Sequence, residues 1–375
     1  MIRIGVNALY LIPGGVGGTE IYLRSLLQAL AEIDPVNRYF VFTNQETGPD
    51  LVPAAENWTT VPLEVRAMSR PARILYEQTT LPMEARRLRL DVLFNPGFTA
   101  PILSPCPSVT VFHDLQHKRQ PENFRWFDLP FWRALLYASA HRSKHLLADS
   151  EATRDDLIRF YHLDATKITV APLGVDPVFF EIAHRRRPEP FFLVVSTLHP
   201  HKNLDRLIQS FAAFHAEHPD FRLIIAGLRG FHTESLESLR ASLRLDDAVQ
   251  FTGWIPREDL YDLFARAYAF FYPTTFEGFG LPVLEALAAA VPTACSNIEP
   301  LAGIAGQAAL QFDPSDDAAI QAAMTRIVCD EPLRVQLAAA GPPQAAKFSW
   351  RQTAQITLCT LTNQIKESKS LWNKL

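Results

Sequence analysis

Short apolar runs alternate with longer amphipathic stretches along all 375 residues of the chain. Continuous apolar runs are typical of strands buried on both faces of a parallel sheet, and amphipathic stretches are typical of the helices that cover it. The pattern therefore predicts an α/β fold. The predicted strands are Ile2–Val6, Tyr39–Thr43, Val92–Asn95, Val109–Phe112, Leu146–Ala148 and Ile168–Ala171 in the first half, and Phe191–Val195, Leu223–Ala226, Val249–Thr252, Ala269–Tyr272, Pro292–Cys295 and Ala309–Phe312 in the second.

A segment rich in proline and charge separates the two series of strands. It extends from Pro172–Pro177 to Arg185–Pro190, and we interpret its arginine triplet as a solvated linker feature. We therefore expect two Rossmann-like domains, residues 1–180 and 188–350, with a C-terminal helix over 351–375 that packs back on the first. Two such sheets facing each other across a cleft would bind ligands at the carboxyl ends of their strands. The helices predicted in the first half are Glu20–Ile33, Ala72–Arg87, Leu129–His141 and Glu151–Tyr161.

The composition narrows the class of protein. The chain is 48% hydrophobic and 20% charged, which supplies full cores and excludes a disordered chain. Its net charge of -4 argues against a nucleic-acid partner. The N-terminus lacks signal-peptide features and no apolar stretch is long enough for a membrane span, so we expect a cytoplasmic protein. The cysteines form no C-x-x-C pair, which excludes a disulfide scaffold or a cysteine-based zinc site; they are Cys106, Cys295, Cys329 and Cys359.

Arginines gather between residues 66 and 89. A solvated helix face explains such a cluster, and so does a face that meets an anionic acceptor or phospholipid. Peripheral contact of the N-terminal domain with the inner face of a membrane stays compatible with the sequence, because it requires only a basic, apolar face. The cluster consists of Arg66, Arg70, Arg73, Arg86, Arg87 and Arg89, with Glu64, Glu77 and Glu84 opposing it.

Two loops of the first half carry candidate chemistry. The loop Gly14–Gly18 follows the first strand and precedes a helix, where glycine N–H groups can approach a phosphate; plain loop flexibility is the alternative. Glu20 stands where the dinucleotide fingerprint needs its last glycine, and no Gly-Lys-Ser/Thr follows. His113, with Asp114, also follows a strand, where it could hydrogen-bond a substrate hydroxyl or donate a proton, or else serve as a capping or core residue.

Two loops of the second half carry stronger signals. Lys202 lies near a predicted helix N-terminus, a placement that the helix dipole disfavours unless an anion is bound. Glu277 lies in a glycine-rich loop after a strand, and Glu285 lies in the helix that follows, within an apolar stretch. A buried carboxylate costs free energy unless polar groups pair with it, and a ribose diol is a suitable partner. We expect the amides of Gly278–Gly280 to meet a sugar or phosphate.

These motifs resemble those of glycosyltransferase family 4, retaining enzymes with the GT-B fold. The family's E-x7-E signature corresponds to Glu277 and Glu285, and its Lys-Asn-Leu element to Lys202–Leu204. The N-terminal glycine loop and His113-Asp114 match as well, and the matches run in family order from about residue 5 to residue 315. Further matching segments are Asp149–Thr153, Pro172–Asp176 and Phe251–Trp254.

The resemblance implies roles for these residues. Glu285 would bind the ribose of a sugar nucleotide, and Glu277 with the amides after it would hold the donor sugar. Lys202 would neutralise the leaving diphosphate, and His113 would contact the sugar from the other domain. The implied catalytic residues are therefore Glu277, His113 and Lys202, and the implied donor-binding residues are Gly15, Gly17, Gly18, Lys202, Gly278, Phe279, Gly280, Leu281 and Glu285.

The resemblance also implies a metal-independent hexosyltransferase that retains the anomeric configuration and needs no cofactor. The absence of an Asp-x-Asp motif agrees with this expectation. The wording of the motifs is closest to bacterial mannosyltransferases of surface-polysaccharide or O-antigen assembly, with GDP-mannose as donor and a glycan or lipid-linked saccharide as acceptor. The family's second diphosphate clamp, an arginine shortly before the lysine, is missing, and His201 and Arg229 are the candidates to replace it. After Ser296-Asn297 the family usually shows Pro-Glu, whereas this chain has Glu299-Pro300.

Other functions fit the same fold. One alternative is a glucosyl- or N-acetylglucosaminyl-type transferase that uses a UDP-sugar, and another is a sugar-nucleotide epimerase. A dehydrogenase is disfavoured by the missing glycine and by the lack of an acidic residue after Tyr39–Thr43. A non-enzymatic binding protein of two domains would normally be exported, which the N-terminus does not suggest.

Overall fold

The computed structural model describes residues 1–15 and 17–372, and it divides into two compact units. Unit 1 comprises Met1–Gly174 and Ser349–Leu375, and unit 2 comprises Val175–Phe348. The last three residues of the predicted C-terminal helix lie outside the described part of the chain. No helix in the described residues is both long and apolar enough to cross a membrane.

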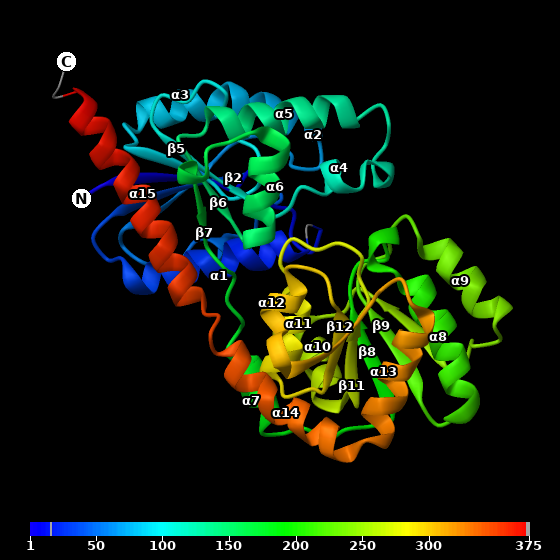
Figure 1. The fold of residues 1–375 in the computed structure, drawn as a ribbon. Helices are drawn as coiled ribbons and strands as arrows, with labels where there is room; N and C mark the ends of the chain where they lie inside the picture. Colours follow the sequence, from blue (N-terminus) through cyan, green and yellow to red (C-terminus); the bar gives the residue numbers. More distant parts are fainter. Residues whose placement is uncertain (16, 373–375) are drawn as a thin grey trace. The chain divides into compact units, whose positions relative to one another are not determined.

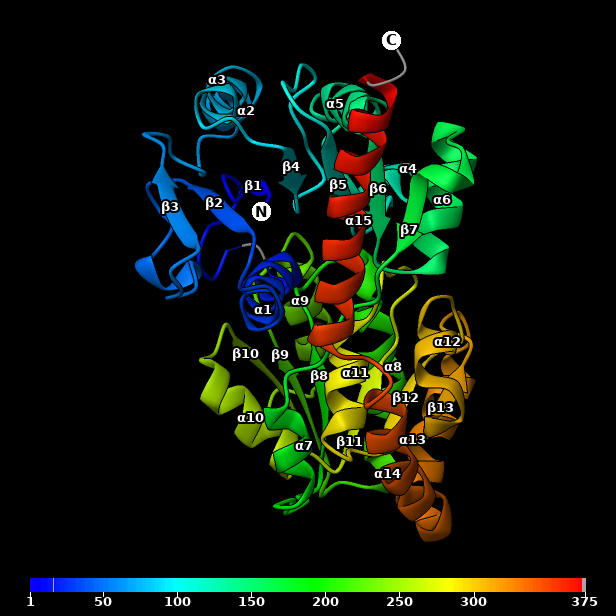
Figure 2. The same cartoon turned by 90° about the vertical axis from the view of Figure 1, so that its left-hand side faces the viewer.

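Unit 1 is built on a seven-stranded parallel sheet with the order β3-β2-β1-β4-β5-β6-β7. Figures 1 and 2 show the helices α2, α3 and α5 on the same side of this sheet. The strands are β1 (Arg3–Asn7), β2 (Arg38–Thr43), β3 (Trp58–Pro62), β4 (Val92–Asn95), β5 (Ser108–Phe112), β6 (His145–Ala148) and β7 (Ile168–Val170). The helices are α1 (Gly18–Ile33), α2 (Arg70–Gln78), α3 (Thr80–Arg87), α4 (Gln116–Arg119), α5 (Leu129–Arg142), α6 (Glu151–Tyr161) and α15 (Trp350–Trp372), with short 3-10 turns at Pro49–Leu51, Pro121–Asn123 and Ala165–Lys167.

Strand β3 was not predicted from the sequence. It lies at the edge of the sheet, and most of its side chains are exposed or half-buried. An edge strand with this exposure lacks the continuous apolar run on which the prediction relied. Only Trp58 is buried, and its ring stacks on Tyr39 of β2 with ring centroids 4.0 Å apart.

The helix predicted over 72–87 is interrupted. The structure has α2 and α3 in its place, with Thr79 between them at φ -118° and ψ -64°. Pro82 has no N–H to donate to the carbonyl of Gln78, so a continuous helix would lose a hydrogen bond there. The Thr79 hydroxyl instead donates to the carbonyl of Leu75 at 2.7 Å.

The C-terminal helix α15 packs within unit 1, against α1. Its first residue, Trp350, lies edge-on to Tyr22 of α1, with ring centroids 6.1 Å apart. The Thr353 hydroxyl donates to the carbonyl of Pro172 at 2.5 Å. A Cβ added at Gly174 would lie 2.0 Å from the backbone nitrogen of Trp350, so this close approach requires glycine.

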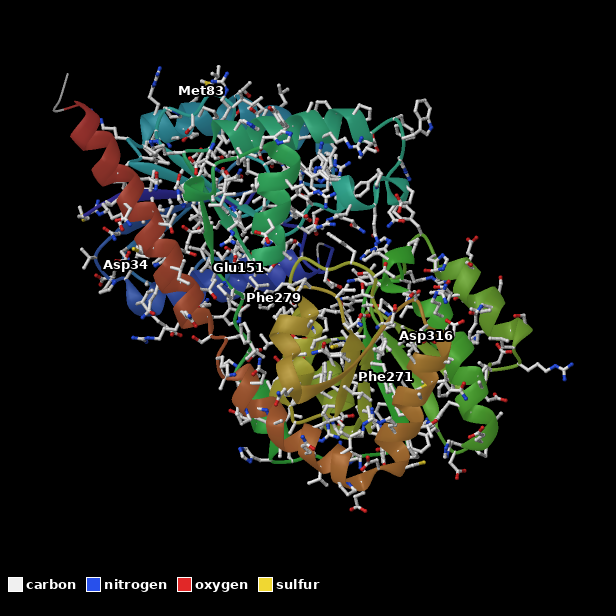
Figure 3. The ribbon with its side chains drawn as sticks, viewed as in Figure 1. Asp34, Met83, Glu151, Phe271, Phe279 and Asp316 are labelled. Atoms are coloured by element: carbon white, nitrogen blue, oxygen red, sulfur yellow. The ribbon has the colours of Figure 1, made fainter. Side chains whose placement is uncertain are left out.

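Unit 2 has a six-stranded parallel sheet with the order β10-β9-β8-β11-β12-β13. Its strands are β8 (Phe191–Val195), β9 (Arg222–Ala226), β10 (Val249–Gly253), β11 (Ala269–Tyr272), β12 (Thr293–Ser296) and β13 (Ala309–Phe312). Its helices are α7 (Val178–Ala183), α8 (Leu204–Glu217), α9 (Thr233–Ser242), α10 (Arg257–Arg266), α11 (Leu281–Ala288), α12 (Leu301–Ala305), α13 (Asp317–Cys329) and α14 (Glu331–Ala345), with 3-10 turns at Pro200–Lys202 and Gly306–Ala308. A cluster of buried side chains that includes Phe192, Phe211 and Phe271 forms a core of this unit. Figure 3 shows the position of Phe271.

The predicted linker is more ordered than its composition suggested. It contains α7, whose Phe179 is fully buried against Tyr261 and Phe264. The arginine triplet is not merely solvated, because the Arg186 guanidinium donates to the carbonyl of Ala267 at 2.7 Å. Burial lowers the pKa of Arg186 to about 10. This arginine therefore anchors the segment to unit 2.

Candidate active site

The strongest candidate site lies in unit 2, where the loops after β8 and β11 meet. Lys202 ends the 3-10 turn after β8, and its ammonium group pairs with Glu277 Oε1. The Tyr272 hydroxyl donates to the same oxygen at 2.6 Å, and Lys202 Nζ lies 3.1 Å from that hydroxyl. The side chains of Lys202 and Glu277 are each only 14% exposed. The structure thus brings together two of the predicted catalytic residues, 75 positions apart in the sequence.

Backbone contacts hold the two loops in place. The carbonyl of His201 accepts hydrogen bonds from the Thr275 amide at 2.8 Å and the Thr274 hydroxyl at 2.9 Å. The Asn203 side-chain amide donates to the carbonyls of Pro273 at 3.0 Å and Pro314 at 2.8 Å. Asn203 itself has left-handed φ and ψ, which an asparagine tolerates better than most residues. The two residues therefore have different roles: Lys202 places a positive charge in the site, and Asn203 ties the neighbouring loops together.

The glycine loop of unit 2 ends against α12. Gly280 adopts a φ of 111°, and a Cβ added there would lie 2.2 Å from Leu301 Cδ2. Phe279 is buried and packs edge-on against Phe348. Leu281 begins α11 and is buried, with Pro282 in the first turn, where a missing N–H costs nothing. Packing thus fixes the backbone that carries the predicted donor-binding amides.

Glu285 lies in α11 and is only 3% exposed. Burial raises the pKa of this carboxyl to about 7, although the nearby charge of Arg257 acts to lower it. The Arg257 guanidinium at the start of α10 lies 3.4 Å from Glu285 Oε1 and 3.3 Å from Asp176 Oδ2. The Tyr261 hydroxyl also donates to Asp176, at 2.7 Å. Burial raises the pKa of the Tyr272 hydroxyl well above its ordinary range, and the negative charges of Glu277 and Glu285 raise it further.

The sequence did not lead us to Arg257, Tyr261 or a role for Asp176. One signal was present: an arginine at the first position of a helix opposes the helix dipole, as a lysine near a helix start does. We used that signal for Lys202 and overlooked it at Arg257. The partner of Arg257, Asp176, lies 81 residues away along the chain, so only the fold reveals the pairing.

The two candidates for a second diphosphate cation differ in their surroundings. Burial, together with the charge of Lys202, lowers the pKa of His201 to about 3. This histidine is therefore neutral near pH 7. The Arg229 side chain is 64% exposed and pairs with Glu237 at 2.9 Å. Arg229 is the candidate that carries a charge.

Some backbone amides of the glycine loop in unit 1 already have hydrogen-bond partners within that unit. The Glu20 carboxylate accepts a hydrogen bond from the Gly14 amide at 2.7 Å, and the Gly15 amide donates to the carbonyl of Ile12 at 2.8 Å. A Cβ added at Gly17 or Gly18 would meet none of the described atoms within 4 Å. Packing does not explain glycine at position 18, where φ is ordinary as well. That position stays a candidate for contact with a ligand.

Both ring nitrogens of His113 have hydrogen-bond partners. Nδ1 lies 2.7 Å from Asp149 Oδ2, and Nε2 lies 2.8 Å from the carbonyl oxygen of Pro96. Burial alone would lower the pKa of His113, but the charge and hydrogen bond of Asp149 outweigh it, so the net shift is upward. The ring also lies edge-on to Tyr22 and Phe98. The predicted contact of His113 with a sugar stays a prediction, because both ring nitrogens already have partners within unit 1.

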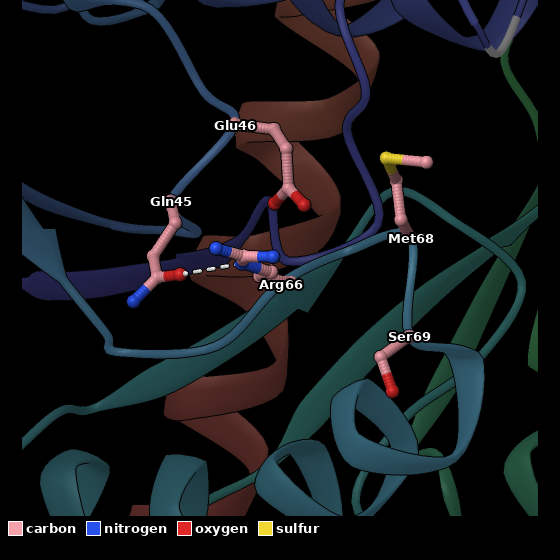
Figure 4. A pocket seen from close by; sticks show the side chains of 5 residues that line it. All are labelled: Gln45, Glu46, Arg66, Met68 and Ser69. Carbon is pink, nitrogen blue, oxygen red and sulfur yellow. Dashed lines mark hydrogen bonds between the residues drawn. The ribbon is translucent and has the colours of Figure 1, made fainter.

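A pocket of about 730 Å³ opens elsewhere in unit 1 (Figure 4). In this pocket Arg66 Nε donates to Gln45 Oε1 at 3.4 Å. Arg66 belongs to the arginine cluster noted in the sequence. The pocket contains none of the predicted donor-binding or catalytic residues. It is lined by Gln45, Glu46, Arg66, Met68 and Ser69.

Comparisons with known proteins decide the family. Residues 177–343 match the family of glycosyl transferases group 1, and residues 16–179 match glycosyltransferase family 4. The O-antigen chain mannosyltransferase B of Escherichia coli is 30% identical over 262 residues, which cover 67% of this chain and 69% of that protein. The chain belongs to the group 1 glycosyltransferases. The resemblance predicted from the motifs is thereby confirmed.

Further matches agree with this assignment. The O-antigen chain mannosyltransferase RfbU of Salmonella typhimurium is 31% identical over 220 residues, which cover 59% of this chain and 60% of that protein. Among solved structures, the sucrose-phosphate synthase from Thermosynechococcus elongatus superimposes with a TM-score of 0.80 over 98% of this chain and 100% of that one, at 19% identity. This likeness confirms the predicted fold class, two parallel-sheet α/β domains of the GT-B type.

The described residues contain no group of three or more His, Cys, Asp or Glu side chains that could hold a metal ion.

Proposed function

We propose that this glycosyltransferase moves a hexose from a nucleotide diphosphate to a glycan or lipid-linked saccharide in surface-polysaccharide synthesis. The proposed donor is GDP-mannose, and the proposed reaction retains the anomeric configuration and requires neither a metal nor another cofactor. The similarity to O-antigen mannosyltransferases supports the donor and the pathway.

One observation carries the proposal. A largely buried lysine and a largely buried glutamate meet after β8 and β11, and a fully buried glutamate follows in α11. In the proposed reaction Lys202 neutralises charge that develops on the leaving diphosphate, an interaction that strengthens toward the transition state. Glu277, with the amides of Gly278 and Phe279, holds the sugar, and Glu285 accepts hydrogen bonds from the ribose hydroxyls.

The proposal also includes residues of unit 1. Gly15, Gly17 and Gly18 are proposed to contact the donor, and open space around the last two supports this. His113 is proposed to contact the sugar, which requires Nε2 to exchange the carbonyl of Pro96 for a sugar hydroxyl.

Transfer assays test the function. Purified protein is incubated with radiolabelled GDP-mannose, UDP-glucose or UDP-N-acetylglucosamine, with and without a lipid extract that contains saccharide acceptors. We expect label from GDP-mannose in the lipid or glycan fraction, and only when the extract is present. Label transferred from a UDP-sugar instead would overturn the choice of donor. An epimerised sugar formed from donor alone would overturn the transferase function.

We also propose that unit 1 contacts an anionic membrane surface. Helices α2, α3 and α5 and the turn before α5 carry exposed apolar side chains. The Arg70 guanidinium lies 4.7 Å above the Trp132 ring, linking α2 with α5. Figure 3 shows Met83 projecting from the outer side of α3. Exposed aromatic and basic side chains together are typical of proteins that bind at membrane interfaces. The exposed apolar residues are Leu75 (61%), Met83 (71%), Trp126 (83%), Phe127 (57%), Phe131 (58%) and Tyr137 (48%).

Vesicle sedimentation tests this contact. The wild type should bind vesicles that contain phosphatidylglycerol and not neutral ones, and the double variant Trp126→Ser, Phe131→Ser should lose binding. Phe231→Ser in unit 2 is the matched control, since Phe231 is 75% exposed. Equal vesicle binding by the double variant and the wild type would remove this surface from the account.

A further inference from the structure

The ribose-binding carboxylate proposed above lies in surroundings that oppose its charge. Glu285 is flanked in α11 by Leu284 and Ala286, both of them fully buried. A carboxylate that leaves water for apolar surroundings tends to take up a proton unless a cation or hydrogen-bond donors stabilise its charge. A protonated carboxyl accepts fewer hydrogen bonds, so it would recognise two ribose hydroxyls less well. The site therefore needs a group that keeps Glu285 ionised.

Among the described residues, Arg257 is the cation whose charge acts on this carboxylate, and several contacts hold it in place. Its Nε donates to the Tyr261 hydroxyl at 2.9 Å, one turn further along α10. Its Nη2 atom contacts both Asp176 Oδ2 and Glu285 Oε1. The guanidinium also lies over the rings of Tyr261, at 5.4 Å, and Phe179, at 5.6 Å. These contacts on several sides distinguish Arg257 from a mobile surface arginine.

The structure assigns Arg257 as a positioning residue for donor binding: anchored by Asp176 and Tyr261, it favours the ionised form of Glu285 and holds that carboxylate in place. This inference rests on the proposed function, because it presumes that Glu285 binds a ribose. The contact of 3.4 Å is long for a charged pair, and an ionised carboxylate has about four acceptor sites. Arg257 therefore supports the charge of Glu285 without using up its capacity to accept hydrogen bonds.

The charges around Glu285 set the direction of the pH effect. In the described part of unit 2, two charged groups shift the pKa of this carboxyl, Arg257 of α10 and Asp176 before α7. The Glu285 charge in turn raises the pKa of Tyr272 of β11. Arg257 is the cation among them, and Asp176 acts in the opposite sense. Burial raises the pKa of Glu285 to about 7 even with Arg257 in place. Without Arg257 the pKa would rise further, and more of the carboxyl would be protonated at neutral pH.

Calorimetric titration with GDP and with UDP between pH 6 and pH 9 tests the inference. For the nucleotide that binds, we expect wild-type affinity to fall about tenfold from pH 8 to pH 6, because the ionised fraction of a group with a pKa near 7 changes by that factor. Arg257→Gln should bind at least about tenfold more weakly at pH 7 and recover much of the loss by pH 9. Arg257→Lys, which keeps the charge, should show a smaller loss.

Two controls separate a positioning role from a structural one. Arg266→Gln removes an arginine from the other end of α10, where it pairs with Asp262 and Glu189, and should leave nucleotide affinity unchanged. Arg257→Gln combined with Glu285→Gln should lose no more affinity than Glu285→Gln alone, and its affinity should not depend on pH. Arg257→Lys keeps the inference testable if Arg257→Gln fails to fold, because an affinity as low as that of Glu285→Gln would contradict it.

The outcomes are distinguishable. If neither nucleotide binds the wild type at any pH, the proposed function fails. If one binds but Arg257→Gln matches the wild type, or loses the same factor at pH 7 and pH 9, the function stands and the role of Arg257 is wrong.

Discussion

Replacing Lys202 by alanine tests the charge arrangement of the proposed site. Lys202 pairs with Glu277 and lies 3.1 Å from the Tyr272 hydroxyl in largely buried surroundings. A hydrogen bond to a charged group contributes about 1.5–3 kcal/mol, and two unit charges 4 Å apart interact by about 4 kcal/mol at an effective dielectric constant of 20. A loss of about 3 kcal/mol in transition-state stabilisation corresponds to a decrease of about 150-fold in kcat/KM. The expected decrease therefore lies between about tenfold and a few hundredfold.

The assay measures release of the nucleoside diphosphate from the donor at substrate concentrations well below KM. Lys202→Arg should retain more activity than Lys202→Ala because it keeps the charge. Lys347→Ala is the matched control, since Lys347 is exposed and bonds only to Gln344 among its described contacts. Combining Lys202→Ala with Glu277→Gln should cost less than the sum of the two changes, since the pair acts as a unit. A Lys202→Ala variant with kcat/KM within twofold of the wild type would refute the assignment of Lys202.

Three further predictions concern the other residues of the account. Glu285→Ala should weaken nucleotide binding, whereas Glu277→Ala should lower kcat more than affinity; calorimetry and steady-state kinetics separate the two, and the reverse pattern would exchange their roles. Gly174→Ala should destabilise the protein by about 1–3 kcal/mol because the new methyl group overlaps the Trp350 backbone. Gly18→Ala should leave the free energy of unfolding unchanged or slightly raised, and it should lower transfer activity. Denaturant unfolding and transfer assays measure both, and full activity in Gly18→Ala would count against the glycine loop. Transfer should continue in EDTA, and a complete loss that manganese restores would contradict the metal-independent reaction.

The sequence was sufficient where a local pattern decides the structure. Strands β4, β8 and β11 have the bounds that their apolar runs predicted, because they lie inside their sheets and nearly all their residues are buried. Helix α6 also has its predicted bounds, and the Ser150 side chain caps it by accepting from the Thr153 amide at 3.1 Å. Lys202 and Glu277 were chosen from their loops, and the fold brings them into contact.

The sequence was insufficient where distant residues decide the environment of a group. Glu77 was counted among the charges of a solvated helix face, but it is buried and accepts hydrogen bonds from Thr99 at 2.8 Å and Asn7 at 3.1 Å. Burial raises the pKa of this carboxyl, with the hydrogen bonds acting against the shift. Arg257 was overlooked for the same reason, since its acidic partners come from other segments of unit 2. Helical spacing identifies the residues on one face, but not what covers that face.

The central claim is that unit 2 binds a nucleoside diphosphate through Lys202 and Glu285. Chemical denaturation with and without GDP, UDP or ADP tests it directly, because a ligand at 100 times its Kd adds about 2.7 kcal/mol to the free energy of unfolding. We predict that one nucleotide, GDP, stabilises the wild type by about this amount, and that Glu285→Ala loses most of the effect at the same concentration. No stabilisation by any of the three nucleotides, or equal stabilisation of Glu285→Ala and the wild type, would contradict the account.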